Sequence, residues 1–269
     1  MPSSNMPTIT PKKELNYLRI LFFTFGLGIM SWVPRFPEVK EALKLTNGGF
    51  GSLISTGSLG SLISLLTVGH VVHKIGVKRV LYVASFFLMA TLIVLTTVNS
   101  SLIFFIANIA FGASISAFHI AINAQGFNYQ DRTGKFIITQ MSGLWSAGAL
   151  ITAFLSGFLV DRVSLHFHIA VLTAFVFLIQ VFVIRSLEPE LLKANQDVNI
   201  EYKLKELFAG FSFDRLVSFG LICAIFLEFA LSDWATIYTK EEIGIKGGFN
   251  TLPFILFTMW MIFGRFTVH

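Results

Sequence analysis

Residues 80–130 limit most strongly what this chain can fold into, because they include no Asp, Glu, Lys or Arg. A helix crosses the hydrocarbon core of a bilayer with about 20 mainly apolar residues, so this stretch is too long for one crossing. The polar sequence Asn99-Ser100-Ser101 supplies a turn at which it divides. Only 13% of the residues are charged and the mean hydropathy is +0.74, whereas a soluble domain averages about 25% charged residues. The sequence therefore predicts an all-α polytopic membrane protein.

About eight segments of the chain are long and apolar enough to cross a bilayer. The predicted spans are residues 17–36, 49–72, 80–98, 102–125, 136–160, 167–184, 216–238 and 249–268. The segment 186–214 is rich in Glu and Lys and separates the sixth span from the seventh. We therefore expect a six-helix unit at residues 1–185, a central cytoplasmic linker at 186–214 and two further helices at 215–269.

The Lys and Arg residues are unequally divided between the two sides of the predicted spans. With the N-terminus inside, fourteen of the twenty fall on the inner side and six on the outer side. Cytoplasmic loops carry the excess of Lys and Arg, so this division predicts a cytoplasmic N-terminus. We attribute the net charge of +5 to this topology, and expect contact with membrane lipid and none with nucleic acid. No A-x-A-like site follows the first apolar segment, which we interpret as a retained helix.

Small and polar residues mark the faces of three predicted spans. In the second span Gly57, Gly60 and Ser64 lie along one side, which predicts close helix packing. Polar or small residues recur in the fourth span at steps of three or four and share one face: Asn108, Gly112, Ser116, His119 and Asn123. Such a face meets protein or a water-filled cavity, so His119 and Asn123 either line a cavity or bond to neighbouring helices. Trp145 in the fifth span is either an interfacial anchor or a stacking surface for a ring.

Two acids, Glu228 and Asp233, interrupt the apolar sequence FLEFALSDWATIY in the seventh span. A carboxylate at the bilayer centre costs roughly 2.5–3.5 kcal/mol on insertion scales. Glu228 lies near the middle of the span, so it must find a partner on another helix, face water or bind a proton. We hypothesise that Glu228 carries a coupling proton or contacts the solute. Asp233 lies nearer the outer surface, where pairing with Arg35 or Lys240 is an alternative to a functional role.

Enzymatic and metal-dependent functions find little support in the sequence. The pairs His70/His73 and His166/His168 fall on opposite sides of the membrane, and neither has a nearby acid to complete a metal site. The sequence contains no G-x-S-x-G, H-E-x-x-H or G-x-x-x-x-G-K-[ST] motif. We therefore expect no enzymatic activity, no metal and no cofactor.

Four blocks of sequence together resemble the major facilitator superfamily, and in particular its sugar- or fucose-permease-like bacterial branch. SWVPRFPEVKEALKLTNGGFGSL is similar to the exit of that branch's first helix, and GHVVHKIGVKRV to the superfamily's inner loop G-x-x-x-D-R-x-G-x-[RK]-R. INAQG with GKFIITQMSGLWSAGAL resembles pieces of helices four and five, and EFALSDWATIY resembles E-x-x-x-x-D-W-[SA] of helix seven. These blocks extend over nearly the whole chain.

The resemblance implies two six-helix lobes that alternate access to a central site. It implies that a gating loop lies on the inner side and includes Gly69, Gly76, Lys78 and Arg79, with His73 where the loop usually has Asp. It also implies that four polar residues approach the central pathway or its rim: Asn123, Gln125, Glu228 and Asp233. Because only about eight spans are predicted, the resemblance further implies a C-terminally truncated form with a complete first lobe.

These observations predict a secondary active transporter in a cell inner membrane. Its expected partners are protons and a small polar, sugar-like solute, moved by alternating access. The residues assigned to the solute and proton pathway are Glu228, Asp233, His119, Asn123, Gln125, Trp145 and Arg35. Two alternatives remain open: a non-transporting remnant or assembly subunit of such a transporter, and an exporter of drugs or metabolites. The sequence does not indicate the oligomeric state.

Overall fold

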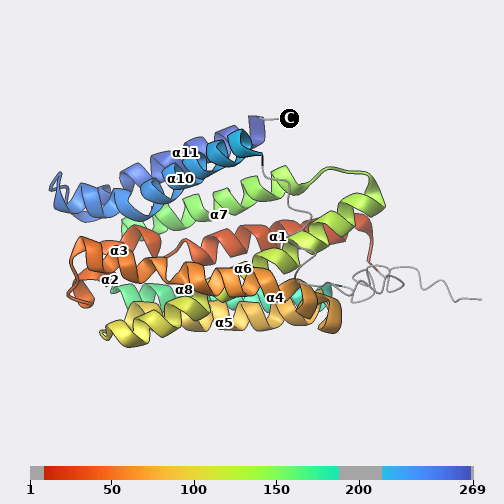
Figure 1. Ribbon diagram of the computed structural model, residues 1–269, viewed down its shortest axis with the longest axis horizontal. Helices are drawn as coiled ribbons and strands as arrows, with labels where there is room; N and C mark the ends of the chain where they lie inside the picture. The colour runs from red at the N-terminus through yellow and green to blue at the C-terminus, as the bar shows by residue number, and fades with distance from the viewer. Residues whose placement is uncertain (1–8, 188–213, 268–269) are drawn as a thin grey trace, which may run out of the picture.

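The computed structural model describes residues 9–187 and 214–267, and every regular element within these ranges is a helix (Figure 1). Eight helical spans among them are long and apolar enough to cross a membrane. Each overlaps one predicted span, so the all-α polytopic fold and the count of eight are confirmed. The expected linker at 186–214 lies almost entirely outside the described residues.

The elements follow one another as antiparallel crossings with short connections. Their bounds are α1 (Pro11–Ile29), η1 (Val33–Arg35), α2 (Phe36–Ala42), α3 (Asn47–Ser55), α4 (Gly57–Ile75), α5 (Val77–Thr97), α6 (Ser101–Thr133), α7 (Ile138–Leu159), α8 (Leu165–Ser186), α10 (Arg215–Glu241), η3 (Gly247–Thr251) and α11 (Leu252–Thr267). We call the end of the bundle that holds the start of α1 the inner end, following the charge asymmetry, and the opposite end the outer end.

The predicted second span is divided in the structure into α3 and α4 at Thr56. The cause is a side chain from α6. The amide Nδ2 of Asn108 donates to the backbone oxygens of Leu53 and Ile54, at 3.1 and 2.7 Å, and to Oγ1 of Thr56 at 3.1 Å. A side chain that captures carbonyl groups in this way interrupts the helical hydrogen-bond ladder. Asn108 therefore bonds between helices.

Glycines let the helices of the first bundle approach closely. A Cβ atom on Gly60 of α4 would lie 1.8 Å from the backbone oxygen of Ile109 on α6. A Cβ atom on Gly148 of α7 would lie 2.1 Å from the backbone oxygen of Phe23 on α1. Small residues at such contacts are how transmembrane helices gain packing energy without a hydrophobic driving force. The close packing expected for the second span is thus confirmed at Gly60.

The last two helices lie along one side of this bundle, next to α7 (Figure 1). α11 packs against α7, while α10 contacts η1 and α2 at the outer end. The buried residues of α10 all belong to its outer half: Ser232, Thr236, Ile237 and Thr239. Its inner half is exposed in the described chain. The outer end is therefore where α10 is held against the first bundle.

We predict that Gly60→Ala lowers the free energy of unfolding by about 1–3 kcal/mol, the usual cost of overpacking, because the added methyl group meets backbone. Gly69→Ala on the same helix is the matched control, since nothing lies within 4 Å of its Cβ position. There alanine stabilises the helix by up to about 1 kcal/mol. Melting temperatures of the purified variants in detergent measure the difference, and equal values would contradict the packing described.

Candidate functional site

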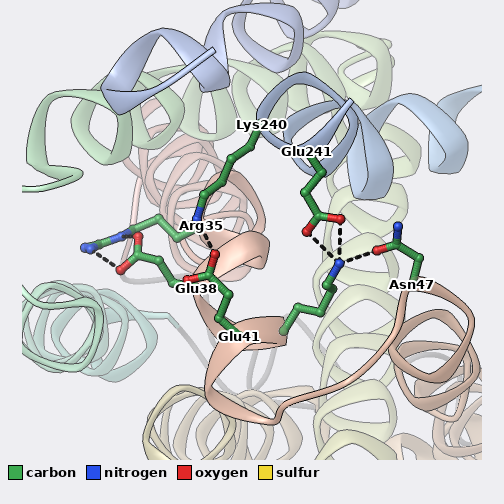
Figure 2. Close-up of polar contacts among 7 residues, drawn as sticks. Arg35, Glu38, Glu41, Asn47, Lys240 and Glu241 are labelled. Carbon is green, nitrogen blue, oxygen red and sulfur yellow. Dashed lines mark hydrogen bonds and ion pairs between the residues drawn. The ribbon is translucent and has the colours of Figure 1, made fainter. Parts of the chain in front are cut away.

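Four charged residues at the outer end join α10 to α2 through crossed ion pairs (Figure 2). Nζ of Lys40 lies 2.5 and 2.6 Å from the two carboxylate oxygens of Glu241, and it also donates to Asn47 at the start of α3. In return, Nζ of Lys240 lies 2.6 Å from Oε1 of Glu41. We call Lys40, Glu41, Lys240 and Glu241 the outer ion-pair cluster. It connects segments two hundred residues apart in the sequence.

The two pairs of this cluster differ in burial, and therefore in strength. The side chain of Lys40 is 10% exposed and that of Glu241 27%, whereas Lys240 and Glu41 are 32% and 60% exposed. Breaking a buried pair by removing one partner costs roughly 3–5 kcal/mol, while an exposed pair contributes about 0–1 kcal/mol. Of the two ion pairs, the contact of Lys40 with Glu241 therefore contributes more to holding α10 against α2 at the outer end.

Arg35 lies next to this cluster but serves the first bundle. Its guanidinium binds both carboxylate oxygens of Glu38 at 2.6 Å and donates to the backbone oxygen of Val163 at 2.9 Å. Its Nη1 also lies 3.5 Å from Nδ1 of His168. These contacts tie η1 to α2 and to the start of α8. A cavity of about 40 Å³ beside Arg35, Glu38 and Lys240 has room for roughly one water molecule.

A second polar cluster lies deeper, where α7, α10 and α11 meet. Nη2 of Arg265 on α11 lies 3.5 Å from Oε1 of Glu228 on α10. On its other side the guanidinium donates to the backbone oxygen of Ser142 at 3.4 Å and to Oγ of Ser146, and it lies over the ring of Trp145 at 5.5 Å. We call Glu228, Arg265, Ser142, Trp145 and Ser146 the Glu228–Arg265 cluster. The charge of Glu228 within an apolar span is thus compensated by a cation on the next helix, Arg265.

The Glu228–Arg265 cluster offers hydrogen-bond donors, hydrogen-bond acceptors and an aromatic face, which are the groups that bind a ligand ring with polar substituents. Within the described chain, Nε of Arg265 has no hydrogen-bond partner, and the Glu228 side chain is 41% exposed. A guanidinium edge donates hydrogen bonds, a carboxylate accepts them, and an indole offers a face for stacking. The guanidinium of Arg265 lies near the Trp145 ring, and both predicted roles of Trp145, interfacial anchor and stacking surface for a solute ring, stay predictions.

Asp233 belongs to neither cluster. Among residues 9–187 and 214–267 it makes no ion pair within 4.0 Å. The alternative in which it pairs with Arg35 or Lys240 is wrong, because those cations bind Glu38 and Glu41. The next residue, Trp234, packs against Gly51 of α3, which fixes this part of α10.

The polar face predicted on the fourth span is divided between different surroundings. Asn108 is buried in the contact with α3 and α4 described above. His119 is exposed and stacks on Phe25 of α1, with ring centroids 6.1 Å apart. Asn123 is half-buried and donates to the backbone oxygen of His119, 2.9 Å away in its own helix. Neither residue contacts the Glu228–Arg265 cluster, so a cavity-lining role stays a prediction for both.

Gln125 takes part in a buried polar contact between the inner ends of α1 and α6. Its Nε2 donates to Oε1 of Glu14 at 2.7 Å, and Nη2 of Arg132 donates to the same oxygen at 2.6 Å. The side chain of Glu14 is 1% exposed. Sequence reasoning missed Glu14 and the role of Arg265, because both lie close to helix ends where charge indicates topology. Of these two residues, Arg265 is the one that lies at the interface with α10.

The predicted gating loop joins α4 to α5 at the inner end. Gly76 has a φ of +86°, which a residue with a side chain rarely adopts, so glycine is required at this turn. Nζ of Lys78 donates to the backbone oxygens of Arg185 and Leu187, both at 2.7 Å, which ties α5 to the end of α8. Gly69, His73 and Arg79 are exposed. Gating by this loop stays a prediction, since its observed contacts lie within the first bundle.

Eight apolar helices in the described chain, with ion pairs between α10 and its neighbours α2 and α11, define a multi-pass helical membrane protein. The sequence-family model of the Major Facilitator Superfamily matches residues 18–268, and the chain therefore belongs to that family. This membership confirms the predicted superfamily.

Two curated relatives of this chain are longer than the chain itself. An uncharacterised MFS-type transporter from Yersinia pestis is 26% identical over 135 residues, which cover 50% of this chain and 35% of that protein. Membrane protein MosC from Rhizobium meliloti is 22% identical over 259 residues, 95% of this chain and 61% of its own length. The chain thus spans about a third and about three fifths of these two relatives.

Solved structures show the same fold. The nucleoside transporter NupG matches with a TM-score of 0.64 at 15% identity, covering 86% of this chain and 60% of NupG. A mutant of NupG matches with a TM-score of 0.67 at 16% identity, covering 85% of this chain and 58% of the mutant. At this level of identity the similarity extends to the fold alone.

We predict that Lys40→Glu lowers the free energy of unfolding by about 3 kcal/mol, because it leaves Glu241 facing a like charge. The double variant Lys40→Glu/Glu241→Lys restores most of that loss by rebuilding the pair in reverse. Lys240→Glu costs about 1 kcal/mol or less, since its pair is more exposed. Lys44→Glu is the control, as Lys44 is exposed and outside the cluster. Melting temperatures of the purified variants measure these differences. A double variant that is no more stable than Lys40→Glu would contradict the pairing of Lys40 with Glu241.

Proposed function

We propose that this protein is a secondary active transporter that moves a small polar, sugar-like solute across a bacterial inner membrane. The observation that carries the proposal is the Glu228–Arg265 cluster, which places a charge-balanced pair and an indole ring between the first bundle and the last two helices. Polar and charged groups inside a membrane are costly, and they are concentrated where a solute or ion passes.

The balanced charge of this cluster favours an uncharged solute. Arg265 and Glu228 neutralise one another, so an anionic solute that displaced Glu228 would leave the carboxylate without its cation. A neutral ring with several hydroxyl groups bonds to the guanidinium and the carboxylate together, and stacks on Trp145, without disturbing that balance. The resemblance of the sequence to the sugar- or fucose-permease-like branch agrees with this class of solute.

The outer ion-pair cluster supports an alternating-access mechanism. With the cluster formed, α10 is held against α2 at the outer end, and the Glu228–Arg265 cluster lies on the inner side of that closure. Opening the outer end requires both ion pairs to break, and it exposes the central groups to the other side of the membrane. We further propose that proton binding couples this exchange to the proton gradient, and that the N-terminus is cytoplasmic.

We predict that the purified protein in liposomes takes up at least one sugar from a radiolabelled panel of hexoses and pentoses, and that an inward proton gradient increases uptake. Glu228→Gln and Arg265→Gln each reduce uptake at least about tenfold, since a lost charge-assisted contact is worth roughly 1.5–3 kcal/mol. Trp145→Phe reduces it less, because the smaller ring keeps a stacking face. Glu242→Gln, exposed at the outer end, is the control with unchanged uptake.

Three outcomes separate this proposal from its rivals. Undiminished uptake in Glu228→Gln and Arg265→Gln refutes the assignment of the cluster to the solute. Uptake of apolar cations in place of sugars indicates a drug exporter. An absence of uptake for every member of the panel refutes a sugar transporter and agrees with a non-transporting subunit.

A further inference from the structure

We propose that Asp233, and not Glu228, is the residue that binds the coupling proton, and that the outer ion-pair cluster controls its access to water. The inference rests on the proposed function, because a coupling proton has meaning only in a transporter. It deepens that function by giving different tasks to two of the three acids of α10: Glu228 contacts the solute with Arg265, and Asp233 exchanges a proton.

The first reason is the difference in pairing between the two acids. Glu228 has the guanidinium of Arg265 at 3.5 Å, so a cation lies next to its carboxylate. Asp233 is partly buried, and no Lys, Arg or His nitrogen in the described parts of the chain lies within 4.0 Å of its carboxyl group. A carboxylate without a cation, inside a membrane helix, is strongly destabilised, so the neutral, protonated acid is the stable form there.

The second reason is that the elements packed against α10 offer Asp233 no unengaged cation. On η1, Arg35 is bound by Glu38 of α2, and on α2, Lys40 is bound by Glu241 while Glu41 holds Lys240. On α11, Arg265 is bound by Glu228. Neither η3 nor α3 contains a titratable residue. The charge state of Asp233 therefore depends on hydration more than on an ion-pair partner.

The third reason is the position of Asp233 beneath the outer ion-pair cluster. Lys240 follows Asp233 by seven residues, which is two helical turns and places both on one face of α10, about 10 Å apart along the axis. Lys240 reaches Glu41 of α2 across the interface, so Asp233 faces the same interface on the inner side of the closure. Breaking the ion pairs admits water first to this face.

Between Asp233 and Lys240 on α10 lies a buried residue whose side chain has no hydrogen-bond partner in the described chain. Thr236, one turn outward from Asp233, is fully buried, and its Oγ1 has no partner in the described chain. A buried hydroxyl group without a partner is stabilised when water enters and forms a hydrogen bond with it. Water that enters as the ion pairs open therefore meets Thr236 and then Asp233, where it hydrates the carboxylate and lets the proton leave. Loss of the proton in turn favours the open, hydrated form, which is the coupling.

The test measures how accessible Thr236 is from outside as the pH changes. In a background with Cys223→Ser, the variant Thr236→Cys is treated in liposomes with a maleimide that does not cross membranes. We expect the labelling rate to rise several-fold from mildly acidic to mildly alkaline pH. Because thiol reactivity itself rises with pH, each rate is divided by that of Lys44→Cys, an exposed outer position.

Two further substitutions assign the effect to one acid. Asp233→Asn imitates the protonated acid, so labelling of Thr236→Cys stays low and independent of pH. Glu228→Gln leaves the pH dependence in place. The opposite pattern, in which Glu228→Gln abolishes the dependence and Asp233→Asn keeps it, overturns the inference. Labelling that does not change with pH in the unsubstituted chain overturns it as well.

A second measurement keeps the inference testable if Thr236→Cys fails to fold. The melting temperature of the unaltered chain is compared with that of Asp233→Asn over the same pH range. A proton held more tightly in the folded state makes the folded state less stable as pH rises, so the advantage of Asp233→Asn grows with pH. A constant difference refutes the assignment. Both measurements need no solute, so their failure is distinct from an absence of sugar uptake.

Discussion

The free-energy cost of placing a charge away from water governs the arrangement of the polar groups in this protein. Glu14, Glu228 and Glu241 each have a cation from another helix within 3.5 Å. Each pairing crosses between two helices, so satisfying the charge also fixes how those helices meet. The ion pairs are therefore packing contacts and candidate functional groups at once.

Two positions along α10 illustrate how this requirement fixes a helix against its neighbours. Its outer end is anchored to α2 by crossed pairs, and its middle is anchored to α11 by Glu228 and Arg265. Ion pairs at an interface are reversible, because water compensates each charge when the surfaces separate. An apolar contact of the same area lacks such a replacement partner. Charged contacts thus suit a surface that opens and closes, while the glycine contacts of α4 with α6 and α1 with α7 suit one that stays packed.

The candidate site was only partly predictable. Glu228, Asp233 and Trp145 stand out in the sequence because each is unusual for its apolar surroundings. Lys40 and Glu41 do not, since adjacent charges near a helix end are ordinary in a loop. Their role appears only when Lys240 and Glu241, two hundred residues later, are brought opposite them. Arg265 is similar: as a single basic residue near the inner surface it indicates topology, and its contact with Glu228 depends on how α10 and α11 lie side by side.

By itself the sequence determined the class of fold, the number of spans and the family, because each follows from the local run of apolar residues and short motifs. A residue needs no knowledge of its distant neighbours to be apolar or to lie in a turn. Only the tertiary structure decided which polar residues share a site, how α3 separates from α4, and that Glu228 has an ion-pair partner while Asp233 has none among the described residues. Those outcomes depend on distances between helices, and the three-residue and four-residue periodicity of a single helix does not contain them.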